Sequence, residues 1–62
     1  GMAIALYSFQ EAGILNQDNF DIVNTHPNLS GIADALFYLK QATILNQDNF
    51  AALIAPNRAI LV

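Results

Sequence analysis

A stretch of seven residues, Ile14 to Phe20, occurs a second time, letter for letter, as Ile44 to Phe50. Two identical segments thirty residues apart are expected to adopt the same local structure, so this repetition limits the fold more than any other feature. The polar centre of each copy has the composition of a helix start. Asn16 is a favoured N-cap, and Asp18 adds negative charge near the positive end of the helix dipole. We therefore interpret each copy as a turn that begins a helix.

The other residues of the stretch fit this interpretation. Leu15 and Phe20 have the spacing of a hydrophobic staple, and Asn19 occupies the position of the Glu or Gln in a capping box. A polar binding loop is the alternative. The stretch lacks the alternating acidic groups, the central Gly and the terminal Glu of a calcium loop, so the cap is favoured.

Apolar residues recur at helical spacing, and Pro27 and Pro56 each end such a pattern. Ser30 is the expected N-cap of the third helix. We expect four helices, over residues 2–12, 17–25 and 47–55, with the third beginning after Ser30.

The first helix ends at Gly13, which suits a left-handed C-terminal cap. Thr43 stands at the equivalent place thirty residues later. A threonine there carries left-handed strain of about 1 kcal/mol, or the second turn relaxes to another shape.

The halves of the chain also agree at Gly1/Gly31, Ala5/Ala35, Leu6/Leu36 and Ala12/Ala42. A period near thirty residues with two helices per period is typical of helical repeats, which need stacked neighbours to bury their apolar faces. We therefore predict an all-α fold of four short helices in two αα-hairpin repeats, with a helical bundle completed by dimerisation. The domain is a single one, residues 1–62, with repeats at 2–30 and 31–60.

The composition favours self-association. Of the 62 residues, 55% are apolar, only 11% are charged and none is cysteine, whereas an average protein has about 25% charged residues. A chain this short has too much surface to hide that apolar fraction alone. We predict a homodimer, or docking on a protein partner, through an interface formed by Ile4, Tyr7, Phe37, Tyr38, Ile60, Leu61 and Val62.

The charge distribution argues against nucleic acid and membranes as partners. The net charge is −3, and Lys40 and Arg58 are the only basic residues, too few to neutralise several phosphates or to bind an anionic bilayer. No apolar run reaches the length of a membrane span, and no signal peptide is evident. We expect a cytoplasmic protein, with export as an effector as the alternative.

The sequence offers little chemistry. His26 is the only histidine, and Ser8 and Ser30 have no evident base beside them. We predict a non-catalytic structural or protein-interaction module, with no catalytic residue, cofactor or metal. The alternatives are a small-molecule or peptide binder in a groove at the dimer interface and, less favoured, a DNA-binding helix-turn-helix.

The string from Gln10 to Phe20, followed by His26-Pro27, resembles a short helix-turn-helix repeat. This repeat occurs in effector-like and ankyrin-containing proteins of intracellular bacteria such as Legionella. The resemblance implies a bacterial origin and a scaffold role without catalytic residues.

Overall fold

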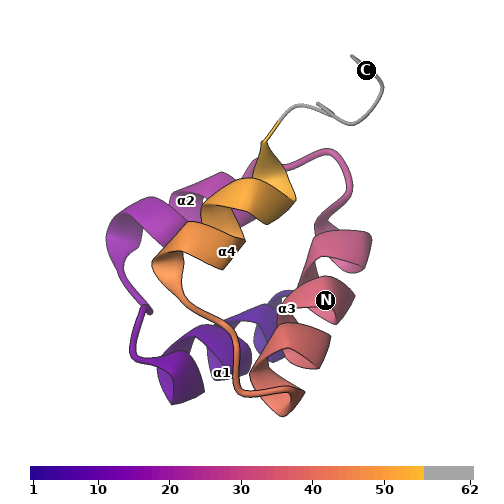
Figure 1. Ribbon diagram of the computed structural model, residues 1–62. Coiled ribbons are helices and arrows are strands. Elements are labelled where there is room, and N and C mark those ends of the chain that lie inside the picture. The colour runs from indigo at the N-terminus through magenta and orange to yellow at the C-terminus, as the bar shows by residue number, and fades with distance from the viewer. Residues whose placement is uncertain (56–62) are drawn as a thin grey trace, which may run out of the picture.

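The computed structural model describes residues 1–55, and the secondary structure of this part of the chain is α-helical, with no strand (Figure 1). The all-α prediction is therefore confirmed. The predicted interface residues Ile60, Leu61 and Val62 lie outside the described residues. The helices are α1 (Met2–Ala12), α2 (Gln17–Asn24), α3 (Leu29–Gln41) and α4 (Gln47–Ile54).

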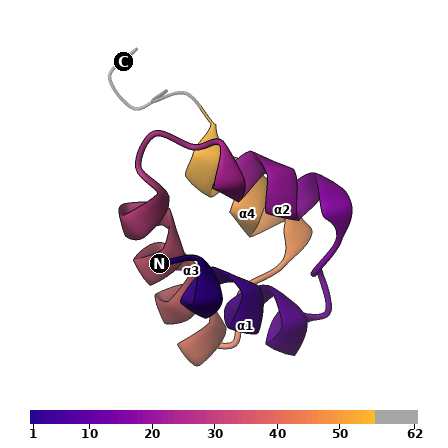
Figure 2. The same ribbon diagram turned by 180° about the vertical axis from the view of Figure 1, so that it is seen from behind.

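The helices surround one small core. The most extensive helix contact is between α1 and α3, and both views show α2 and α4 together on the other side (Figures 1 and 2). Phe9 of α1 and Phe50 of α4 meet edge to face at its centre, with ring centroids 5.0 Å apart and planes at 86°. Both rings are fully buried, so this pair joins the two halves of the sequence. The buried apolar residues are Ala5, Phe9, Val23, Ile32, Ala33, Leu36, Leu45 and Phe50.

Both copies of the repeated stretch begin a helix, as predicted. Asn16 and Asn46 are N-caps with extended backbones, at φ −149° and −143°. The Oδ1 atom of Asn16 accepts from the backbone N–H of Asn19 at 2.9 Å, and Oδ1 of Asn46 accepts from that of Asn49 at 2.8 Å. Each cap satisfies one of the backbone donors that a helix start leaves without a partner.

The turns that precede these caps also have the same shape. Gly13 has φ 75° and Thr43 has φ 60°, so both are left-handed. Gly13 and Ile14 donate their backbone N–H groups to carbonyls of α1 at 3.0 and 2.9 Å, and Thr43 and Ile44 repeat both bonds on α3 at the same distances. This pair of backbone hydrogen bonds defines a Schellman cap. The second turn therefore keeps its shape, and the alternative of a relaxed turn is wrong.

The start of the third helix differs from the prediction. Helix α3 begins at Leu29, and its N-cap is Asn28, whose Oδ1 accepts from the N–H of Gly31 at 3.2 Å. Ser30 lies inside the first turn instead of capping it. Asn28 caps as well as serine does and comes earlier in the chain, and the earlier start lets Leu29 pack against the core. The other helices end within one residue of the expected places.

Candidate interaction surface

The two repeated turns meet through a pair of side-chain amides. Nδ2 of Asn19 donates to Oε1 of Gln47 at 2.9 Å, and Nε2 of Gln47 donates to Oδ1 of Asn19 at 3.1 Å. Asn19 is only 2% exposed, and its Nδ2 also donates to the carbonyl of Ile14 at 2.8 Å. A buried amide needs such partners, because an unpaired one costs about 1–3 kcal/mol. Asn19 therefore both closes its own turn and fastens it to the second one.

The sequence places Asn19 at the capping-box position and does not predict this role. A capping box side chain reaches back to the N-cap N–H, whereas Asn19 donates to the carbonyl of Ile14. Asparagine is one methylene shorter than the usual Glu or Gln, and here its amide donates to this carbonyl instead. Asn49 makes the same bond to Ile44 at 2.7 Å. The sequence shows that the two copies are identical, but it does not show that they contact each other.

The amide contact between the turns occurs once, not twice. A two-fold axis relating the halves would pair Gln17 with Asn49 just as it pairs Gln47 with Asn19. Gln17 instead donates to Asp21 of its own helix at 2.9 Å, and Nδ2 of Asn49 donates to the local carbonyl of Ile44. The two halves therefore pack on each other without two-fold symmetry. Each half uses one side in this contact and has a different side that the contact leaves open.

Identical residues of the two copies differ in exposure for this reason. Leu15 is 44% exposed, whereas Leu45 is 8% exposed. The order is reversed for the preceding residue, because Ile44 is 50% exposed and Ile14 is partly buried. Local conformation is shared, as the caps and turns show. The difference in exposure therefore comes from the neighbouring half.

The described members of the predicted interface lie on α1 and α3. Ile4, Tyr7 and Tyr38 are 42%, 48% and 72% exposed, and Phe37 is partly buried. The ammonium of Lys40 stands 4.7 Å from the centre of the Tyr7 ring and 5.7 Å from that of Phe37, within the range of a cation–π attraction. Their role as an interface stays a prediction.

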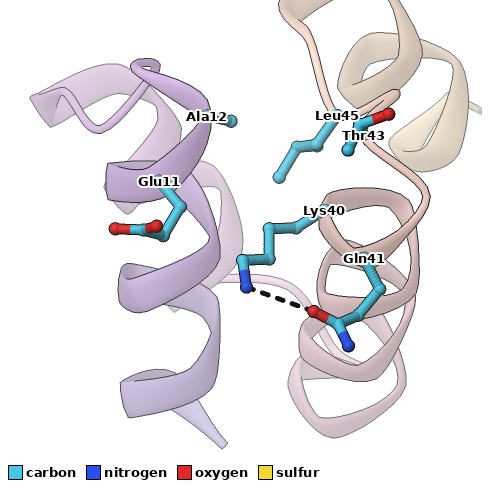
Figure 3. Close-up of a pocket in the computed structure, with 6 residues that line it drawn as sticks. All are labelled: Glu11, Ala12, Lys40, Gln41, Thr43 and Leu45. Carbon is cyan, nitrogen blue, oxygen red and sulfur yellow. Dashed lines mark hydrogen bonds between the residues drawn. The ribbon is translucent and has the colours of Figure 1, made fainter.

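A cleft of about 420 Å³ lies between the C-terminal ends of α1 and α3 (Figure 3). Nζ of Lys40 donates to Oε1 of Gln41 at 3.1 Å, and the Glu11 carboxylate points away from both. The polar groups thus do not converge on a common point, as those of a small-molecule site usually do. The lining residues are Glu11, Ala12, Lys40, Gln41, Thr43 and Leu45.

A second hollow, of about 390 Å³, lies beside the amide pair. Its polar groups include the side chains of Asn19 and Gln47, which are already bonded to each other. Asp18 lines the hollow too, at the start of α2. The hollow marks where the two turns approach each other.

Within residues 1–55, no three His, Cys, Asp or Glu side chains come together as metal ligands would. Nδ1 of His26 accepts from the backbone N–H of Asn28 at 2.9 Å. His26 thus stabilises the turn before α3. None of the helices in this part of the chain has the length and apolar character needed to cross a bilayer.

No protein-family model, curated protein or solved structure matches the chain. The likeness to helix-turn-helix repeats of intracellular bacteria therefore stays a prediction.

Proposed function

We propose that the protein is a non-catalytic interaction module of two αα-hairpin repeats that associates with further copies of itself, with a homodimer as the smallest assembly. One observation carries the proposal. Five large apolar side chains are each more than 40% exposed within the described residues: Ile4, Tyr7, Leu15, Tyr38 and Ile44. Large apolar side chains exposed to water favour association with another protein surface.

The local structure supports the repeat part of the proposal. Each half contains a helix, a Schellman turn with a left-handed residue, an Asn cap and a second helix. Repeats of this kind bury their apolar faces by stacking, and two of them leave outer faces without a neighbour. The resemblance to bacterial helix-turn-helix repeats implies the same scaffold role.

The composition supports an apolar partner surface. The chain has a net charge of −3 and 11% charged residues, so electrostatic attraction to an anionic partner is unfavourable. Tyr38, at 72% exposure, is the most exposed large apolar side chain within the described residues. Tyrosine is enriched in the centres of protein interfaces.

Light scattering on the purified protein at micromolar concentration tests the proposal. We expect a mass above the 6.7 kDa of one chain and a lower mass for Tyr38→Glu. Gln10→Glu adds the same charge at another exposed helix position and serves as the control. A mass of one chain for the unmodified protein would overturn the proposal.

A further inference from the structure

We infer that copies of this chain associate head to tail, with the front of one copy packed on the back of the next in the way that its second half packs on its first. The inference rests on the proposed self-association and adds its geometry. The front face consists of Leu15 and Gln17. The back face consists of Tyr38, Ile44 and Asn49.

The front face belongs to the first half. The residues thirty positions later show what a neighbour does to these places. Leu45, the equivalent of Leu15, is 8% exposed instead of 44%. Gln47, the equivalent of Gln17, is bonded to Asn19. The first half covers Leu45 and bonds the exposed side chain of Gln47. A second copy in the same position would cover Leu15 and bond Gln17.

The back face belongs to the second half, and the same comparison applies in reverse. Ser8 is fully buried, whereas its equivalent Tyr38 is 72% exposed. Asn19 is 2% exposed, whereas Asn49 is only partly buried. Gln47 of the second half contacts Asn19, and the equivalent place on the second half stays open.

Three of the five exposed apolar residues fall on the two faces. Leu15 lies on the front, and Tyr38 and Ile44 lie on the back. Tyr7 lies beside Lys40 of the second half and is outside the inferred contact. The fifth exposed apolar residue, Ile4, corresponds to Asp34, an exposed carboxylate. The first half does not cover Asp34, so a copy packed in the same way would not cover Ile4. Ile4 therefore falls outside the inferred contact.

The polar groups also match across the contact. Gln17 and Asn49 are the same residue types as Gln47 and Asn19, which exchange two hydrogen bonds at 2.9 and 3.1 Å. Both lie in the same cap geometry as their equivalents. In a head-to-tail contact, Asn49 of one copy pairs with Gln17 of the next. Such a contact joins unlike faces, so association continues past two copies to a ring or a filament.

The test is a mixing experiment with two variants that each block one face. Leu15→Glu blocks the front and Ile44→Glu blocks the back, while circular dichroism checks that both remain helical. Ile4→Glu adds the same charge outside the contact and is the control. Should either variant lose helicity, Leu15→Ser and Ile44→Ser replace them. The mass of each protein, and of the equimolar mixture, is measured by light scattering over a range of concentrations.

We expect the unmodified chain and Ile4→Glu to exceed two copies as the concentration rises, and each blocked variant to remain a single chain. The mixture should form a dimer and stop there, because it holds one intact front and one intact back. A dimer that does not grow, or that survives one of the two face variants, would overturn the head-to-tail geometry but keep self-association. A single-chain mass for the unmodified protein would overturn both.

Discussion

Asn19 and Gln47 exchange two hydrogen bonds between the first turns of α2 and α4, at 2.9 and 3.1 Å. Their counterparts Asn49 and Gln17 have the same sequence surroundings and make only local side-chain bonds. The chain therefore contains the same pair of amide side chains twice. One pair bonds across the two halves, and the side chains of the other pair do not bond each other. This difference makes it possible to measure what a neighbouring half contributes to the free energy of unfolding.

Asn19→Ala should destabilise the fold by about 2–3 kcal/mol, because it removes the bonds of a buried amide to Gln47 and to the carbonyl of Ile14. Urea unfolding followed by circular dichroism, at one fixed protein concentration, measures the free energy of unfolding. Asn49→Ala is the matched control. It removes the local bond to Ile44 at a more exposed position, and we expect a cost below about 1 kcal/mol. Equal costs for the two would mean that the amide contact adds no stability.

Thr43→Gly should stabilise the protein by up to about 1 kcal/mol, because Thr43 is left-handed at φ 60° and glycine adopts this conformation without steric cost. The reverse change, Gly13→Ala, should cost about 1 kcal/mol. A Cβ at Gly13 meets no atom within 4 Å, so backbone conformation alone sets that cost. Thermal unfolding of both variants measures the effects. A loss of stability in Thr43→Gly would show that the Thr43 side chain compensates its strain.

Asn28→Ala should cost about 1 kcal/mol, as expected for the loss of an N-cap, since Oδ1 of Asn28 accepts from the N–H of Gly31. Ser30→Ala should change the stability by only a few tenths of a kcal/mol, because Ser30 lies exposed within α3. Chemical unfolding of both proteins decides between the two cap positions. The opposite ranking would move the start of α3 back to the place predicted from the sequence.

Phe50→Leu should destabilise the protein by more than the loss of buried area alone, because the ring packs edge to face on Phe9 at 5.0 Å. A double-mutant cycle with Phe9→Leu isolates the ring–ring contribution, which we expect to be about 0.5–1.5 kcal/mol. The cycle is measured by urea unfolding of the four proteins. A coupling energy of zero would mean that the two rings contribute as separate apolar groups.

The helices and their starts were largely predictable, because cap chemistry and apolar spacing are local. Asn16, Asn46 and Gly13 have the roles expected from the sequence. The prediction of Ser30 as a cap is wrong because Asn28, two residues earlier, satisfies the same cap rule equally well.

The candidate surface was only partly predictable, because it depends on which half lies against which. Two copies of one sequence look equivalent, so nothing local distinguishes Leu15 from Leu45 or Asn19 from Asn49. Their different exposure arises from packing between residues thirty positions apart in the chain. The interface predicted from the sequence includes Ile4, whereas the inferred contact uses Leu15 and Ile44, and both stay predictions.

Cross-linking between chains tests the account most directly. The protein has no cysteine, so Gln17→Cys and Asn49→Cys each introduce a single thiol, one at the front and one at the back. A short bis-maleimide reagent is added to each variant alone and to their equimolar mixture, and the products are separated on a denaturing gel. We predict a cross-linked pair of chains in the mixture and little in either variant alone. Pairs that form as readily within one variant, or in none of the three samples, would contradict the account.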